Sequence, residues 1–143
     1  MTTLRLSAGE RAFLQAQRVA HLATVDVAGR PHVVPVCFAF EEGRVYSPLD
    51  EKPKRVSPER LARVRNIQAH PFVALVVDHY EEDWTRLGWL LLRGTADVLE
   101  RGEEHRRAVG LLRAKYPQYR THRLEDRPIL RITLASARNW GTL

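Results

Sequence analysis

The chain has 143 residues, of which 44% are hydrophobic and 28% charged, and its formal net charge is +6 at pH 7. This composition excludes a disordered or fibrous chain and fits one globular domain spanning residues 1–143. The first twenty residues carry three arginines and no long apolar run, and Cys37 is the single cysteine. We therefore expect a cytoplasmic protein without a membrane span or an internal disulfide.

The N-terminal part of the chain predicts one helix followed by one strand. Residues 3–17 predict a short helix with Ser7 as its N-cap, because a serine hydroxyl can accept a hydrogen bond from the first helical turn. Residues 19–25 predict a strand. The DVAGRP segment that follows predicts a turn, since Gly29 can adopt a positive φ.

The next apolar run, HVVPVCFAF at residues 32–40, predicts a single strand. Both of its alternating faces are largely apolar, so we expect the strand to be covered on both sides. Pro35 cannot donate to a ladder, which places it at a sheet edge or a bulge. A turn at residues 41–43 and a strand at residues 44–47 then complete a hairpin.

The rest of the chain predicts two further helices and three further strands. Ser57 and Pro58 mark a helix start, and Gly94 indicates a bulge or a close backbone approach within a long strand. The expected helices are 58–70 and 103–116, and the expected strands are 72–77, 88–99 and 129–135. Six strands without strict βαβ alternation predict a mainly β, α+β fold: a six-stranded antiparallel barrel with peripheral helices.

Positive charge gathers in one part of the sequence. Residues 50–65 hold six cations and three carboxylates, whereas residues 78–83 (DHYEED) hold four carboxylates and no Lys or Arg. Lys52, Lys54 and Arg55 follow a strand in the segment VYSPLDEKPKRV. This segregation favours a local site for an anion over a uniformly basic surface. The alternative is that Lys54 and Arg55 are ordinary solvated loop charges.

Motifs for side-chain catalysis are absent from the sequence. The six histidines show no spacing typical of metal ligands, and there is no GxSxG, Walker or GxGxxG motif. A bound redox cofactor would then carry the reaction, and the protein would bind and orient it. A planar anionic cofactor needs a hydroxyl and cations for its phosphate, a flat apolar wall for its ring, and an aromatic residue that closes the site. The candidates for these roles are, in that order, Ser47 with Lys52, Lys54 and Arg55; Val34, Pro35 and Val36 on the neighbouring strand of the same hairpin; and Trp84 or Trp140.

The order and spacing of several short motifs resemble a known family. The motifs are LAT at residues 22–24, GRP at 29–31, PV at 35–36, YS at 46–47 followed by Lys52, and RN at 65–66 followed by Pro71. Over residues 19–100 the chain is similar to the pyridoxamine-phosphate-oxidase-like (FMN-binding) split β-barrel family. It resembles most the branch that uses the deazaflavin coenzyme F-420, and DHYEEDW and NWG resemble a subgroup of that branch.

This resemblance implies a set of roles for individual residues. Pro35 and Val36 would lie along the flavin-type ring, and Ser47 and Lys52 would contact the phosphate. The K-x-x-N spacing of this branch is matched by Arg63 and Asn66, with arginine in place of lysine and a longer insertion before it, so that Lys52 or Lys54 is an alternative for that role. Family members are typically homodimers with sites at the subunit boundary. Trp84 or Trp140 would then face the partner's cofactor.

The main functional hypothesis is an oxidoreductase that transfers a hydride between coenzyme F-420 and a small organic substrate. The cations continue from Lys52 to Arg65, a longer track than one phosphate requires, which favours F-420 with its carboxylate tail over FMN. An FMN-dependent oxidoreductase on the same fold is the alternative. Two hypotheses from other classes are a non-catalytic flavin or pigment carrier and a nucleic-acid-binding barrel. No expected strand alternates aromatic and basic residues, which speaks against nucleic acid as a partner.

Overall fold

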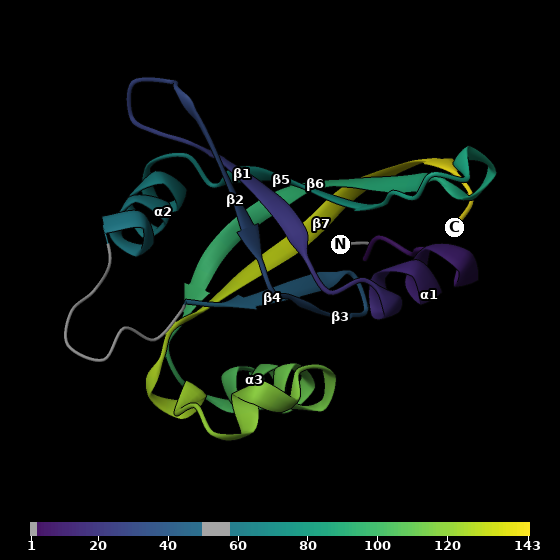
Figure 1. The fold of residues 1–143 in the computed structure, drawn as a ribbon. Coiled ribbons are helices and arrows are strands. Elements are labelled where there is room, and N and C mark those ends of the chain that lie inside the picture. Colours follow the sequence, from purple (N-terminus) through teal and green to yellow (C-terminus); the bar gives the residue numbers. More distant parts are fainter. Residues whose placement is uncertain (1–2, 50–57) are drawn as a thin grey trace.

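The structure is a computed structural model that describes residues 3–49 and 58–143, and within the second range the side chains from residue 62 onward. Seven strands of the described residues form one twisted antiparallel sheet in the order β2-β1-β5-β6-β7-β4-β3 (Figure 1). The strands are β1 (Ala20–Val25), β2 (Pro31–Val36), β3 (Ala39–Glu41), β4 (Arg44–Pro48), β5 (Phe72–His79), β6 (Gly88–Leu99) and β7 (Ile129–Gly141). The mainly β antiparallel class with peripheral helices is confirmed, but the described sheet has seven strands instead of six and is not closed.

The seventh strand arises because the run HVVPVCFAF does not form one strand. β2 ends at Val36 and β3 begins at Ala39, so Cys37 and Phe38 leave the ladder. β2 and β3 are the two edges of the sheet, which confirms the edge position expected for Pro35. The prediction of a single strand is wrong because the apolar alternation continues through the break and carries no signal of it.

The same break changes the expected hairpin. β3 pairs with β4, whereas β2 pairs with β1, so Pro35 lies opposite His21 and not beside Ser47 on a neighbouring strand. β3 and β4 are covered on both faces: Val45 belongs to the core inside the sheet and Tyr46 to a second cluster under a helix. β2 is covered on one face only within this chain, since Val33 on its outer face is 60% exposed.

The helices agree with the sequence predictions, apart from their end residues. Ser7 caps the first helix, its Oγ accepting a hydrogen bond from the Glu10 amide at 3.1 Å while the Glu10 carboxylate accepts one from the Ser7 amide at 2.8 Å. The helices are α1 (Ala8–Ala16), α2 (Pro58–Ala69) and α3 (Glu103–Lys115). Short 3-10 turns are η1 (Trp84–Arg86), η2 (Pro117–Arg120) and η3 (Leu124–Asp126).

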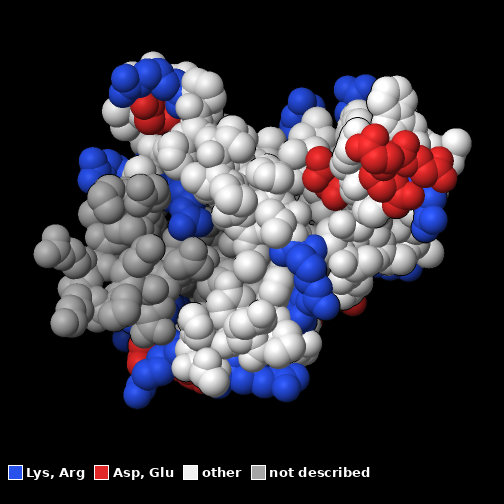
Figure 2. Space-filling model, in the orientation of Figure 1, with Lys and Arg blue, Asp and Glu red and all other residues white. Residues whose placement is uncertain are grey.

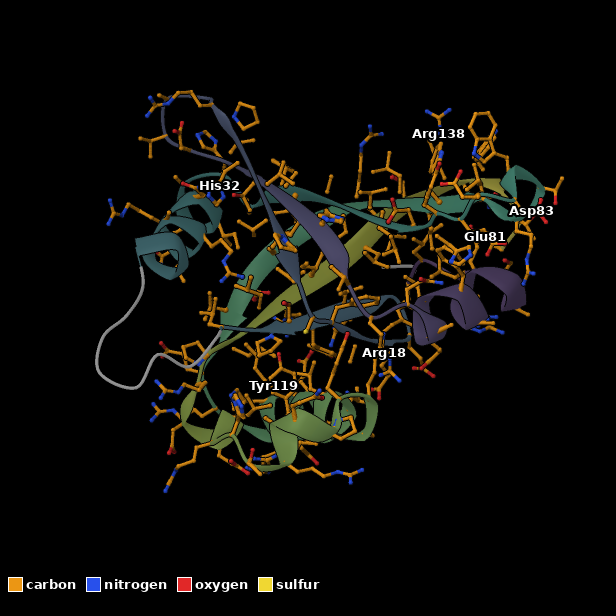
Figure 3. The ribbon with its side chains drawn as sticks, viewed as in Figure 1. Arg18, His32, Glu81, Asp83, Tyr119 and Arg138 are labelled. Carbon is orange, nitrogen blue, oxygen red and sulfur yellow. The ribbon has the colours of Figure 1, made fainter. Side chains whose placement is uncertain are left out.

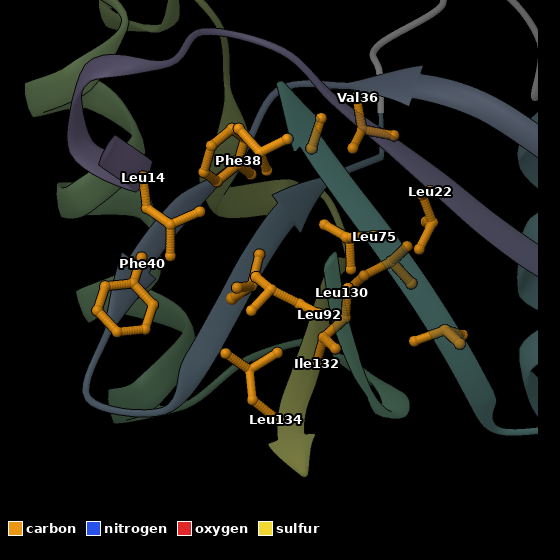
Figure 4. Packing of buried hydrophobic residues seen from close by; sticks show 14 of the residues in the cluster. Leu14, Leu22, Val36, Phe38, Phe40, Leu75, Leu92, Leu130, Ile132 and Leu134 are labelled. Atoms are coloured by element: carbon orange, nitrogen blue, oxygen red, sulfur yellow. The ribbon is translucent and has the colours of Figure 1, made fainter. Parts of the chain in front are cut away.

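Two hydrophobic clusters hold these elements together. The larger cluster fills the inside of the curled sheet, where Leu14 of α1 packs with strand residues such as Leu75 and Leu92 (Figure 4). Ile67 of α2 belongs to the same cluster. The smaller cluster lies between α3 and the other face of β3 and β4, and includes Tyr46, Leu112 and Tyr116. α3 therefore covers the sheet from the side opposite the main core.

The long pair of β6 and β7 forms the middle of the sheet. The ladder register shifts between Arg93 and Gly94, which confirms the expected bulge. A Cβ at Gly94 would lie 2.1 Å from the Thr133 carbonyl oxygen, so the close backbone approach is also present. β7 continues to Gly141, beyond the expected residues 129–135, because it pairs along the whole of β6. Among the described residues no helix is long and apolar enough to span a bilayer.

Candidate functional site

A small hollow lies where β2 ends. Its volume is about 140 Å³. Residues of β2, β4 and α2 and of the segments beside β1 and β2 line it: Val19, Pro35, Val36, Cys37, Pro48 and Arg63. Three of the residues predicted for the site are thus brought together by the fold, namely Pro35, Val36 and Arg63. Val34 does not line this hollow, because its side chain packs against the main core.

Arg63 supplies the positive charge of this hollow. Its side chain is only 7% exposed, although arginine is rarely buried without a charged or polar role. Asn66 fixes the helix that carries it, since the Asn66 amide Nδ2 donates to Thr24 Oγ1 of β1 at 3.1 Å. A buried guanidinium among apolar lining residues fits a ligand that combines an apolar ring with an anionic group. The residues present therefore fit a flavin-type cofactor.

Ser47 does not line the hollow. It is fully buried, and its hydroxyl donates to the Cys37 carbonyl at 2.7 Å, which braces the break after β2. A phosphate contact from Ser47 would require this hydrogen bond to be given up. Lys52, Lys54 and Arg55 lie outside the described residues, so their phosphate role stays a prediction.

A second and larger hollow adjoins the first and shares Val19 and Cys37 with it. Its volume is about 530 Å³, and its other walls come from Arg18 and the segment after α3: Tyr116, Pro117, Gln118 and Tyr119. Figure 3 shows Arg18 and Tyr119 on the side of the sheet that faces α3. The first hollow alone is smaller than the 300–1,000 Å³ typical of cofactor sites, so a cofactor there must extend beyond it.

Two polar side chains lie at or near the second hollow: Tyr116, which lines it, and Lys115, which lines a neighbouring hollow. The Tyr116 hydroxyl lies 2.8 Å from the Arg18 carbonyl oxygen and accepts a hydrogen bond from the Phe38 amide at 3.0 Å. Burial raises the pKa of Tyr116 to about 12, so this hydroxyl stays neutral. The Lys115 ammonium lies 3.7 Å from the centre of the Phe38 ring and donates to the Leu14 carbonyl at 3.0 Å. Burial, with the nearby charge of Arg18, lowers the pKa of Lys115 to about 8.

The two predicted tryptophans lie elsewhere in this chain. Trp84 belongs to η1 and Trp140 to the end of β7, and they are 69% and 52% exposed. This end of the sheet lies far from α2 in Figure 1, and it carries the acidic patch of Asp78, Glu81, Glu82 and Asp83 that is red in Figure 2. The chain therefore does not bring either tryptophan to Pro35 and Arg63, and any such contact would have to come from a second subunit.

Two further observations limit the choice of site. A hollow of about 700 Å³ also borders α2, but two carboxylates, Asp97 and Glu100, line it beside one arginine, Arg101. This balance of charge suits an anionic cofactor less well than the lining around Arg63, which includes no carboxylate among the described residues. Within the described part of the chain, no group of three or more His, Cys, Asp or Glu residues could hold a metal ion. The pair of hollows at the end of β2 is therefore the better candidate.

Several residues of this site were not predicted from the sequence. Arg18 and the Tyr116–Tyr119 segment come together only because α3 returns across the break between β2 and β3. Val19 and Cys37 were placed in apolar runs, a pattern that does not distinguish a pocket wall from a core. The expected end of a helix at residue 116 was the one local signal near this segment.

Comparisons with known proteins agree with this geometry. A 5a,11a-dehydrotetracycline/5a,11a-dehydrooxytetracycline reductase from Streptomyces rimosus is 33% identical over 99 residues, which are 68% of this chain and 67% of the relative. Among solved structures, HutZ, the heme storage protein of Vibrio cholerae, has a TM-score of 0.70 at 19% identity over 97% of this chain and 96% of its own. An F-420 reductase has a TM-score of 0.66 at 23% identity over 93% of this chain and 98% of its own.

The match to a family model spans almost the whole sequence. The model is that of pyridoxamine 5'-phosphate oxidase, and it matches residues 7–141. This range includes β2, α2 and the segment after α3, so both hollows lie inside it. Because this match covers far more than half of the sequence, the chain belongs to the pyridoxamine 5'-phosphate oxidase family.

Proposed function

We propose that the chain binds the deazaflavin coenzyme F-420 at the end of β2 and transfers a hydride between it and a small organic substrate. The observation that carries this proposal is the buried guanidinium of Arg63 in a hollow that Pro35 and Val36 also line. The reductase activity named for the Streptomyces relative and the F-420 reductase with the same fold support it.

The proposal assigns binding and orientation to the protein. When bound, a reduced deazaflavin or flavin supplies the hydride. Arg63 would hold an anionic group of the cofactor, and Pro35 with Val36 would set the plane of its ring. The hydroxyls of Tyr116 and Ser47 form hydrogen bonds with backbone carbonyl groups. We therefore assign to solvent the proton that the substrate takes up.

The proposed active form is a homodimer that uses the outer face of the sheet. Pro35 shares this face with Val33 and Ala23, because Pro35 pairs with His21 and Val33 with Ala23 across β2 and β1. Phe72 is 74% exposed and belongs to an apolar hollow of about 500 Å³ on that face. A second copy of the chain that covered this outer face would contact Pro35. It would thereby enlarge the cofactor site, which has only a small volume within one chain.

Parallel titrations with F-420 and FMN at two salt concentrations test the proposal. The variants are Arg63→Met and, as the control, Arg106→Met, which changes an exposed arginine of α3 outside both hollows. Loss of a charge-assisted hydrogen bond worth about 1.5–3 kcal/mol should weaken cofactor binding at least about tenfold in Arg63→Met. Arg106→Met should change it little. Replacing both Lys52 and Lys54 by alanine should add a loss that shrinks at high salt.

The same titrations separate the alternatives. Tighter binding of FMN than of F-420, with no effect of the F-420 tail, would replace the deazaflavin proposal by an FMN-dependent oxidoreductase. The fold similarity to HutZ raises a carrier of heme as a second candidate. No histidine lines either hollow among the described residues, so we expect hemin to give no histidine-ligated absorption band. The appearance of such a band without binding of either flavin would favour the carrier.

A further inference from the structure

We propose that Lys115 is a reactive amine and that a hollow between α1 and α3 presents it to a small carbonyl acid, a carboxylate that also carries an aldehyde or keto group. Lys115 forms an imine with the carbonyl group, and Arg18 holds the carboxylate. This proposal does not rest on the cofactor site, because no described residue lines both this hollow and the one that contains Pro35 and Arg63.

The hollow lies where α1 and α3 both meet β3 (Figure 1). Gln15 of α1 and Arg18 after it line one side, Phe40 comes from β3, and Ala114 and Lys115 come from α3. Its volume is about 280 Å³, which is below the range of about 300–1,000 Å³ that is typical of sites for larger ligands and cofactors. The hollow therefore suits a compact molecule.

The charge of this hollow favours an anion. Among its described lining residues, Arg18 and Lys115 are cations, Gln15 adds an amide, and no carboxylate is present. Arg18 lies close to Lys115, since its Nη1 donates to the Lys115 backbone carbonyl. A guanidinium carries five donor hydrogens, so Arg18 keeps donors for the carboxylate of a ligand.

The surroundings of the Lys115 amine favour its neutral, nucleophilic form. The centre of the Phe38 ring lies 3.7 Å from Nζ and excludes water from one side of it. Burial, and then the charge of Arg18, lower the pKa of Lys115 to about 8, against a smaller opposite effect of the Cys37 thiol. Desolvation and a neighbouring cation are two features that activate a lysine as a nucleophile. Lys115 is half-buried, which leaves part of its side chain open to the hollow.

The hydrogen bond that Lys115 donates is compatible with this reaction. Its ammonium donates to the Leu14 carbonyl at 3.0 Å, and an ammonium has three donor hydrogens. After loss of one proton, the amine still has a hydrogen for this bond and gains a lone pair. That lone pair attacks the carbonyl carbon of the ligand.

The reaction balances without an oxidant or a reductant. The lone pair of the amine forms a bond to the carbonyl carbon, the carbonyl oxygen takes up one proton, and the nitrogen releases one, which gives a neutral carbinolamine. The nitrogen then loses its remaining proton, the carbon–oxygen bond breaks, and the oxygen takes up a second proton and leaves as water. One amine and one carbonyl group thus give one imine and one water molecule.

Reductive trapping tests the site, with succinate semialdehyde as the carbonyl acid and butanal as the neutral aldehyde of the same chain length. Cyanoborohydride gives a hydride to the imine carbon and converts each imine into a stable secondary amine, which mass spectrometry of the digested protein locates. Nα-acetyl-lysine in the same solution is the reference, because an ordinary lysine amine is almost fully protonated at about pH 7.5. We expect Lys115 to react with succinate semialdehyde at least about tenfold faster than this reference.

Comparison of the two aldehydes tests the role of Arg18. Relative to the reference amine, Lys115 should prefer succinate semialdehyde over butanal by at least about fivefold, as for one partly exposed charge interaction. Arg18→Gln should abolish this preference, and so should Ala114→Glu, which places a carboxylate at an exposed position of the hollow. Arg106→Gln, which changes an exposed arginine of α3 that does not line the hollow, should keep it. Arg18 and Ala114 belong to different elements, so if one variant fails to fold the other still tests the site.

Three results would overturn the proposal. A Lys115 amine that reacts no faster than the reference is only a structural partner of Leu14 and Phe38. A wild-type protein without the preference for succinate semialdehyde has no site for the acid. A preference that survives either Arg18→Gln or Ala114→Glu in a folded protein is not caused by the charge of this hollow. None of these results bears on the proposed function, which the cofactor titrations test separately.

Discussion

The Lys115 ammonium should lose its proton at a lower pH in the folded chain than in the unfolded chain. Its pKa falls from 10.5 to about 8 in the folded chain because burial and the charge of Arg18 oppose its protonation. Between pH 8 and 10.5 the unfolded chain therefore binds more protons at this position than the folded chain. The contribution of Lys115 to the free energy of unfolding must then rise with pH across that interval.

We expect wild type to gain stability relative to Lys115→Met as the pH rises from 8 to 10. The pH range stops at 10, just below the ordinary lysine pKa of 10.5, where the unfolded chain also loses this proton and the gain levels off. Urea unfolding of both proteins at several pH values gives the difference. A difference independent of pH would show that Lys115 is solvated in solution and not buried as described.

Ser47 shows why a residue type alone does not identify a site. A serine that follows a tyrosine at the end of a strand matched the phosphate-binding pattern, yet its hydroxyl donates to the Cys37 carbonyl. We expect Ser47→Ala to destabilise the fold by about 1–3 kcal/mol, the cost of leaving a buried acceptor without its donor. Thermal unfolding of the cofactor-free variant measures this cost. An unchanged midpoint combined with weaker cofactor binding would restore the phosphate role.

At the scale of elements, two glycines offer a matched pair. Gly94 faces the Thr133 carbonyl so closely that a Cβ would lie 2.1 Å from its oxygen, whereas a Cβ at Gly110 in the middle of α3 meets nothing within 4 Å. Gly94→Ala should force the bulge between β6 and β7 to shift, at a cost of about 1–3 kcal/mol. Gly110→Ala should stabilise the chain by roughly 0.5–1 kcal/mol, because glycine weakens a helix. Equal effects of the two changes on denaturant midpoints would contradict this packing.

Local signals predicted most of these elements, and contacts distant in sequence decided the rest. The Ser7 cap, the positive φ of Gly29 and the bulge at Gly94 depend on neighbouring residues, and all three are confirmed. The end of β2 at Val36 depends instead on Tyr116, which reaches the free backbone of Phe38 from the other end of the chain. Periodicity of the strand sequence cannot contain that information. The same reason explains why Pro35 and Arg63 were predicted for the site and Arg18 was not.

At the scale of the whole molecule, the outer face of the sheet should decide the oligomeric state. We expect a homodimer at micromolar concentration, and Phe72→Asp should convert it to a monomer because a carboxylate would be buried in an apolar interface. Val27→Asp is the control, since Val27 is similarly exposed, at 72% against 74%, but lies in the turn between β1 and β2. Light scattering distinguishes the two masses. A monomeric wild-type protein would refute the shared site as well as the dimer.

The strand order also sets a condition on how the chain reaches its folded state. β4 has two partners, β3 beside it in sequence and β7 near the C-terminus, and Val45 pairs with Ile132. During synthesis the β3–β4 hairpin therefore exposes an unpaired strand edge until nearly the whole chain has been made. Pairing over such a separation is slow, and an unpaired edge favours association with other chains. Shortened chains that lack β7 should consequently aggregate rather than persist as smaller folded units.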